Sequence, residues 1–273
     1  MRKSVYFLFF LLFGLFELIV VANDLDVKKS HWKGFERHDF KYKGVKSLLV
    51  IPDSPAKGFP WVWRARFFGH QPQADIELLK RGFHLAYCDV AGLFGNQVAV
   101  ERWNEFYQML ITQKGLSKKP ALEGMSRGGL IIYNWASVNP ERVSCIYGDA
   151  PVCDIRSWPG GKGKGKGGGS AWKAALKAHR ITDEESKSAK VSPIHKLKPI
   201  ANAGIPILHV VGAADKVVPV DENSEIIEKK YKELGGNIHV ISKPGIGHHP
   251  HALKDPRPIV DFILKHSLKI KVD

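Results

Sequence analysis

Segments typical of β-strands and of α-helices alternate along this chain of 273 residues, from about position 59 to its end. Short apolar runs such as Phe83–Cys88 and Ile205–Val211 have the composition of buried strands, and segments such as Val98–Lys114 carry apolar residues at helical spacing. An earlier segment, Lys41–Ile51, is also predicted to be a strand. Because parallel strands are joined by crossover helices, this alternation predicts an α/β fold in which a mostly parallel sheet carries helices on both faces.

One stretch, about residues 154–199, interrupts the alternation and is predicted to be a lid-like insertion after the sixth strand. It contains the run Gly160–Gly169, which consists only of glycine and lysine. Glycine loses much conformational freedom on folding, so we expect this tip to be solvated and mobile. The stretch Trp172–His179 has a helical pattern and is expected to pack over the cleft beside the functional site.

The N-terminus has the pattern of a secretory signal peptide. The basic residues Arg2 and Lys3 precede the apolar run Val5–Val21, and cleavage after Ala22 would leave one domain of residues 23–273. The alternative is an uncleaved anchor, which Glu17 opposes because a carboxylate is costly in hydrocarbon. We therefore expect a secreted or periplasmic protein with no stable membrane anchor after cleavage.

The chain is strongly basic, with a formal charge of +14 that becomes +13 when residues 1–22 are removed. A basic exported protein could meet nucleic acid, an anionic membrane or an anionic substrate. No nucleic-acid-binding motif accompanies the charge, so we expect no nucleic-acid partner.

The cysteines and histidines show no metal-binding pattern. The three cysteines, Cys88, Cys145 and Cys153, are too few for a disulfide scaffold, and spacing leaves open whether Cys145 and Cys153 pair. No C-x-x-C or H-E-x-x-H spacing is present, so we expect no metal.

Gly124–Gly128 is the only G-x-S-x-G sequence in the chain. It falls between a short predicted strand, residues 120–123, and a predicted helix, residues 128–138. A nucleophilic serine needs this context, because it occupies a sharp strand-to-helix turn where neighbouring side chains would clash. The alternative is a glycine-rich turn in which Ser126 only caps the helix.

A serine hydroxyl needs a base to take its proton, and the base needs an acid to orient it. Asp215 follows the predicted strand 205–211, and His248 follows the predicted strand 237–242. Both therefore come after strands, at the carboxyl edge where parallel sheets place their sites. Asp149 or Asp154 could replace the acid, and His249 or His251 could replace the base.

From about Lys41 to Lys265 the chain resembles the α/β-hydrolase superfamily, closest to its esterase and prolyl-oligopeptidase-like branches. The resemblance rests on Gly124–Gly129, on Gly212–Pro219 and on Gly247-His248. It implies that Ser126 is the nucleophile, His248 the general base and then acid, and Asp215 the orienting carboxylate. It implies no cofactor.

The resemblance also implies an oxyanion hole, although the common His-Gly-Gly-Gly sequence is absent. One donor would be the backbone N–H of Arg127. The second would come from the loop after the predicted strand 59–66, where we expect the backbone N–H of Arg66.

Three further residues are candidate substrate contacts: Arg64, Trp158 and His249. A guanidinium suits a substrate carboxylate. The alternative for Arg64 and Arg66 is a structural ion pair with Asp89 or Glu123.

The sequence therefore predicts a secreted serine hydrolase that cleaves carboxylic esters through an acyl-enzyme. Its substrate would be a small-molecule or polysaccharide ester, which could be anionic, such as an acetylated carbohydrate. The alternatives are a serine peptidase of the prolyl-oligopeptidase-like type and a non-catalytic binding protein on the same fold.

Overall fold

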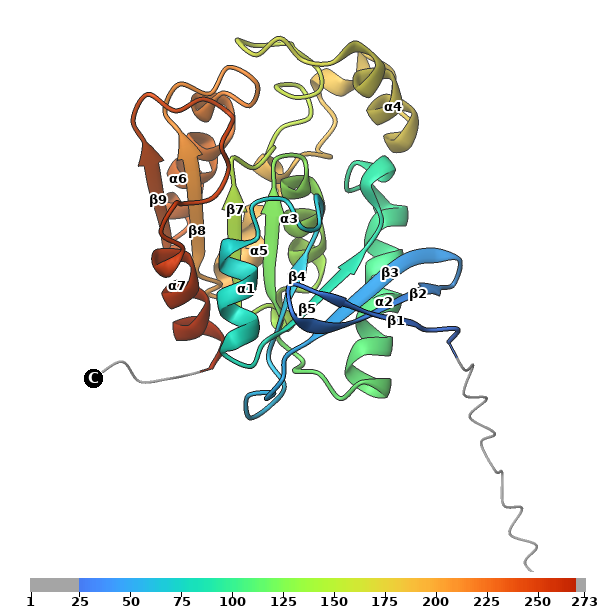
Figure 1. Ribbon diagram of the computed structural model, residues 1–273. Coiled ribbons are helices and arrows are strands. Elements are labelled where there is room, and N and C mark those ends of the chain that lie inside the picture. The colour runs from blue at the N-terminus through green and yellow to red at the C-terminus, as the bar shows by residue number, and fades with distance from the viewer. Residues whose placement is uncertain (1–24, 269–273) are drawn as a thin grey trace, which may run out of the picture.

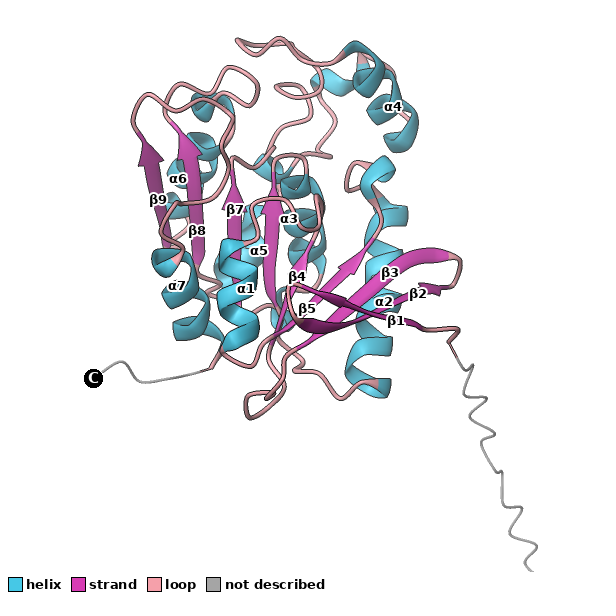
Figure 2. Cartoon of the chain, viewed as in Figure 1, coloured by secondary structure: helices cyan, strands magenta, loops and turns pink. Residues whose placement is uncertain are grey.

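A computed structural model describes residues 25–268, and within that range the chain folds around one sheet of nine strands (Figures 1 and 2). The strand order is β1-β2-β3-β5-β4-β6-β7-β8-β9. The strands are β1 Lys28–Trp32, β2 Phe35–Tyr42, β3 Val45–Ile51, β4 Trp61–Arg64, β5 His84–Cys88, β6 Ala121–Met125, β7 Cys145–Asp149, β8 Ile207–Gly212 and β9 Ile238–Lys243. All pairs from β5 to β9 are parallel, which confirms the predicted mostly parallel α/β sheet.

The sheet begins with an antiparallel part that differs from the sequence prediction. The predicted strand Lys41–Ile51 is in fact the end of β2, a turn and β3. The turn residues Lys43 and Gly44 both have positive φ, 48° and 78°, as a two-residue hairpin requires. A lysine at such a position carries no obvious turn signal, so the sequence pattern does not indicate the hairpin.

Helices cover both faces of the sheet, as predicted. Among the described residues the α-helices are α1 Gln73–Lys80, α2 Gln97–Gln113, α3 Gly128–Val138, α4 Gly169–His179, α5 Leu197–Asn202, α6 Ser224–Glu233 and α7 Arg257–Ser267. Helices α1 and α7 lie in front of the sheet in Figure 1, and their buried residues share one hydrophobic core. Helices α2, α3, α5 and α6 contribute to the core on the opposite face, where Trp63 stacks on Trp103 at 3.9 Å between ring centroids.

The stretch predicted as a lid-like insertion follows β7, the seventh strand, because the sheet begins with more strands than the sequence pattern indicates. Its helix α4 lies above the carboxyl ends of the strands (Figure 1), whereas α5, near its end, packs in the main core. The two parts of this stretch therefore belong to different layers of the molecule.

The glycine- and lysine-rich run is largely exposed but contacts a distant segment of the chain. The backbone N–H of Lys164 donates to Glu222, and the Nζ of Lys164 pairs with Asp221. A Cβ added to Gly163 would collide with the carboxylate of Glu222. Lys162, Gly163 and Lys164 are exposed, as expected for a solvated tip, but these contacts hold the tip against the segment Asp221–Glu222.

Several sequence predictions concern the ends of the chain or its surface. The predicted signal peptide lies outside the described residues. Within the part of the chain that the structure describes, no helix is long and apolar enough to cross a membrane.

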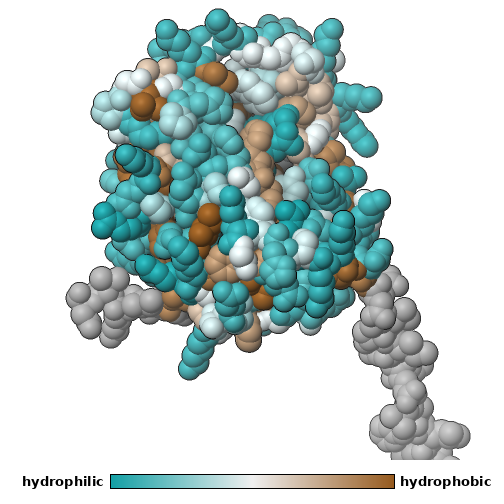
Figure 3. Space-filling model, in the orientation of Figure 1, coloured by the Kyte–Doolittle hydropathy of each residue, from teal (hydrophilic) through white to brown (hydrophobic). Residues whose placement is uncertain are grey.

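The three cysteines are buried free thiols, so Cys145 and Cys153 are not paired. The face of the molecule seen in Figure 3 is mostly hydrophilic, with small separate hydrophobic areas.

Candidate active site

Ser126 occupies a tight turn between β6 and α3. Its φ is +50°, in the left-handed region that a residue with a side chain rarely adopts. Its backbone N–H donates to the carbonyl of Asp149 at 2.8 Å, and its own carbonyl accepts from Gly129 at 2.9 Å. A Cβ on Gly124 would lie 2.5 Å from Ile132, so the glycine of the motif is needed for the turn to close on α3.

The structure brings the three residues of the predicted triad together. Ser126 Oγ lies 3.0 Å from His248 Nε2, and His248 Nδ1 lies 2.7 Å from a carboxylate oxygen of Asp215. The loops after β6, β8 and β9 supply them, and all three loops leave the carboxyl edge of the sheet. His248 and Asp215 are almost buried, while Ser126 is partly exposed, so the hydroxyl is open to a substrate.

Asp215 is held as an anion. Burial by itself raises the pKa of this carboxyl, but hydrogen bonds from His248 and from the backbone N–H groups of Val218 and Val217 outweigh it, and the net pKa is lowered. The two backbone bonds measure 2.9 and 2.8 Å and end on one carboxylate oxygen, while His248 uses the other. The carboxylate is therefore charged and oriented toward the imidazole.

The two predicted oxyanion donors lie at adjoining loops. A Cβ on Gly128 would lie 3.3 Å from the Cβ and 3.7 Å from the backbone nitrogen of Arg66. Among residues 25–268, neither the backbone N–H of Arg66 nor that of Arg127 donates a hydrogen bond. Two unpaired N–H groups beside a serine can serve a developing negative charge.

A second carboxylate–imidazole pair lies next to the first. Asp149, which was an alternative for the acid, accepts from His251 Nδ1 at 2.8 Å, from the backbone N–H of Ala252 at 2.7 Å and from the hydroxyl of Tyr147. The His251 ring contacts the His248 ring edge-on, with centroids 4.7 Å apart. Asp149 thus anchors the loop that carries His248 rather than His248 itself, a role that the sequence pattern does not indicate.

Three histidines of this loop could hold a metal ion by proximity alone, since one ring nitrogen of each of His248, His249 and His251 lies within 4.8 Å of the others. Both ring nitrogens of His248 are already engaged by Ser126 and Asp215, however. An ion bound to His248 would have to displace one of these partners.

Arg64 does not face the site, so its assignment as a substrate contact is wrong. Its side chain is 1% exposed and pairs with Asp75 and with Glu123, the latter at 3.0 Å. It also donates to the backbone carbonyl of His70. Burial raises the pKa of Glu123 well above its usual range, and the two acids together hold the pKa of Arg64 high despite the burial of the guanidinium. The structural alternative with Glu123 therefore applies, with Asp75 as a further partner.

Replacing Arg64 with methionine is expected to lower the free energy of unfolding by about 3–5 kcal/mol, because an acid is left buried without its counter-charge. Even with Glu123 protonated, the buried Asp75 carboxylate would have no counter-charge. Urea denaturation monitored by tryptophan fluorescence measures the change. The matched control is Arg81→Met, an exposed arginine after α1, which should change stability by less than about 0.5 kcal/mol. A similar small effect for Arg64→Met would contradict the buried network.

The remaining candidate contacts, Trp158 and His249, lie close to the site. The Trp158 ring lies near Phe94, and the Arg127 guanidinium lies 5.7 Å from the centroid of each ring. His249 is exposed, and its ring contacts His248 edge-on at 5.0 Å between centroids. Burial, followed by the neighbouring histidines, lowers the pKa of His249.

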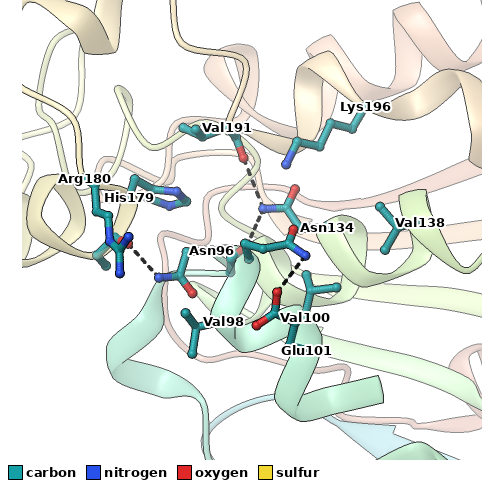
Figure 4. Close-up of a pocket in the computed structure, with 13 residues that line it drawn as sticks. Asn96, Val98, Val100, Glu101, Asn134, Val138, His179, Arg180, Val191 and Lys196 are labelled. Atoms are coloured by element: carbon teal, nitrogen blue, oxygen red, sulfur yellow. Dashed lines mark hydrogen bonds between the residues drawn. The ribbon is translucent and has the colours of Figure 1, made fainter. Parts of the chain in front are cut away.

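A cavity of about 500 Å³ lies between the start of α2, α3 and the end of α4, and none of the triad residues lines it (Figure 4). Two asparagines join the elements around it. Asn96 donates to the carbonyl of Ala178 at 2.6 Å, and Asn134 donates to the carbonyls of Gly95 and Val191. These bonds tie the stretch 154–199 to the rest of the chain.

No family model and no curated protein matches the chain. Solved structures do match it over most of its length. Porphyromonas gingivalis dipeptidyl peptidase 4 matches with a TM-score of 0.64 at 12% identity, and the alignment covers 89% of this chain and 35% of the peptidase. For Pyrococcus horikoshii acylaminoacyl peptidase the TM-score is 0.63 at 12% identity, and the alignment covers 91% of this chain and 43% of the peptidase. For a puromycin hydrolase the TM-score is 0.61 at 18% identity, and the alignment covers 88% of this chain and 37% of the hydrolase.

The chain has the α/β-hydrolase fold. It spans less than half the length of each of these enzymes. At such low sequence identity the structural similarity supports the fold alone. In this fold a strand-to-helix turn presents a serine at the carboxyl edge of the sheet. The activity has to be argued from the residues at that edge.

Proposed function

We propose that this protein is a serine hydrolase that forms an acyl-enzyme on Ser126. The observation that carries the proposal is the continuous hydrogen-bonded series from Ser126 Oγ through His248 to the anionic Asp215, at the nucleophile turn of an α/β-hydrolase fold. A protein that only bound a ligand in this cleft would have no need of the complete series.

The reaction follows from these positions. Ser126 Oγ attacks the substrate carbonyl carbon and gives its proton to His248 Nε2, while Asp215 stabilises the imidazolium through Nδ1–H. The backbone N–H groups of Arg127 and Arg66 bind the oxyanion of the tetrahedral intermediate. His248 then protonates the leaving group. A water molecule, deprotonated by His248, releases the acid from Ser126 and restores the serine.

For the scissile bond we favour a peptide or amide over the carboxylic ester expected from the sequence. Two of the structural neighbours are peptidases by name. The ester hypothesis has no comparable support. Because the triad chemistry is the same for both bonds, activated esters remain suitable reporters of the acyl-enzyme.

A fluorophosphonate probe tests the nucleophile. The wild-type protein should be labelled once, and mass spectrometry of the digest should place the label on the peptide that contains Ser126. A folded protein that remains unlabelled would contradict the hydrolase and favour a binding role.

Hydrolysis of 4-nitrophenyl acetate and of aminoacyl and dipeptidyl 4-nitroanilides then compares the two bond types. Cleavage of the ester without any cleavage of the anilides would favour the esterase.

A further inference from the structure

Two arginines border the nucleophile turn, and within the described part of the chain neither pairs with an acid. Arg66 comes from the loop after β4, and Arg127 directly follows Ser126. Both side chains are partly buried, and both residues line a small hollow together with Phe94. Among residues 25–268, neither guanidinium has a carboxylate oxygen within 4.0 Å, and neither donates a side-chain hydrogen bond. In this respect they differ from Arg64, two positions before Arg66, which has two acids.

The arrangement costs free energy in the unliganded protein. The Nε of Arg66 is buried and has no hydrogen-bond partner in the described part of the chain. Burial lowers the pKa of Arg127, and the positive charge of Arg66 lowers it further. Asp89 is the nearby acid that acts in the opposite direction, but one of its oxygens accepts from the backbone N–H of Ala91 instead. Two neighbouring cations with unused donors favour the binding of an anion.

Aromatic rings support the two guanidinium groups. Arg66 lies 4.8 Å from the ring centroid of Phe67, and Arg127 lies 5.7 Å from those of Phe94 and Trp158. Stacking on a ring restrains the plane of a guanidinium and leaves the N–H groups at its edge available. The pair is therefore held in place before any ligand arrives.

We propose that Arg66 and Arg127 bind a carboxylate of the substrate, so that the enzyme acts on compounds whose acyl part or leaving group carries an acid close to the scissile carbonyl. A carboxylate offers two oxygens in one plane, and two guanidinium groups can satisfy both. This inference rests on the proposed hydrolase, because it concerns the same site. The acid could belong to an acidic sugar or to an acidic peptide, which share this chemistry.

The test compares two esters of matched chain length, neutral 4-nitrophenyl pentanoate and anionic mono-4-nitrophenyl glutarate. The wild-type enzyme should show a higher kcat/KM for the anionic ester. Arg66→Gln and Arg127→Gln should each lower the ratio of anionic to neutral kcat/KM by about tenfold or more, since each removes a charge-assisted contact. The backbone N–H groups remain in both variants, so the neutral ester should lose less activity. Arg81→Gln is the control and should keep the wild-type ratio.

Two further measurements distinguish a substrate contact from a structural role of the two arginines. A purely structural role would lower the melting temperature, whereas removing one of two repelling charges should leave it unchanged or raise it. Calorimetric titration with glutarate should show binding to the wild-type protein and weaker binding to both variants. Unchanged ratios, or equal glutarate affinity in all proteins, would overturn the carboxylate site while leaving the hydrolase intact. Absence of all ester hydrolysis would overturn the hydrolase, and the titration would still decide the anion site.

The source of the acid is distinguished with acetylated polygalacturonate and with glutamyl-containing peptides. If Arg66→Gln and Arg127→Gln lose activity on only one of these two substrates, that substrate is the source of the acid. If both variants keep wild-type activity on both substrates, the result contradicts the carboxylate site.

Discussion

Replacing Ser126 with alanine is expected to lower kcat by about 10⁶-fold. Replacing His248 with alanine should lower kcat by a similar factor, and the double variant should have a kcat no lower than that of either single variant. The reason is that the hydroxyl and the imidazole, 3.0 Å apart, act as one unit. Without the base the serine is a poor nucleophile, and without the serine the base has no proton to take. Steady-state hydrolysis of 4-nitrophenyl acetate, with fluorophosphonate labelling, measures the effect.

The choice of His248 among its neighbours is tested in the same experiment. His239→Ala, on the exposed side of β9, serves as the control for loss of an imidazole. His249→Ala should act mainly on KM, because the ring contacts His248 without reaching Ser126 by a hydrogen bond. A loss of kcat in His249→Ala as large as that in His248→Ala would refute the assignment, and so would additive losses in the Ser126/His248 double variant.

Replacing Asp215 with asparagine should lower kcat by about 10⁴-fold, because an amide no longer stabilises the imidazolium and favours the wrong tautomer. The matched control is Asp149→Asn, which removes the charge from the other buried carboxylate–imidazole pair. Asp149 holds His251 and the backbone N–H of Ala252, so its loss should appear in stability, by about 1.5–3 kcal/mol for one charged hydrogen bond. Turnover and urea denaturation of both variants distinguish the two roles. The opposite result, a severe kcat loss in Asp149→Asn and a mild one in Asp215→Asn, would make Asp149 the orienting acid.

Much of the fold could be predicted because its signals are local. Apolar runs such as Ile205–Val211 alternate with helical patterns, and this order constrains the sheet to be mostly parallel. The pentapeptide Gly124–Gly128 likewise indicates its own turn, because the glycines are needed within a few residues of Ser126. The hairpin at Lys43 could not be predicted in this way, since a lysine with positive φ has no local signature.

The surroundings of charged side chains were harder to predict from the sequence than the positions of helices and strands. Arg64 and Arg66 are two positions apart and look alike in the sequence. Arg64 is buried between Asp75 and Glu123, whereas Arg66 lies beside Arg127 and pairs with no acid of residues 25–268. The difference depends on whether each side chain points into the core or toward the carboxyl edge. The glycine-rich run is a similar case, because its partner Glu222 lies 58 residues away from Lys164.

Local residue order therefore specifies the α/β architecture, the strand-to-helix turn at Ser126 and the candidate residues that follow each strand, because each depends on neighbours within a few positions. Which of these residues meet depends on the packing of distant segments. Packing joins Asp215 to His248 and Asp149 to His251, and it encloses Arg64. Among the residues that the structure describes, it leaves Arg66 and Arg127 without an acid. These outcomes depend on distances between segments far apart in the chain, and charge interactions depend steeply on distance and burial, which residue order does not specify.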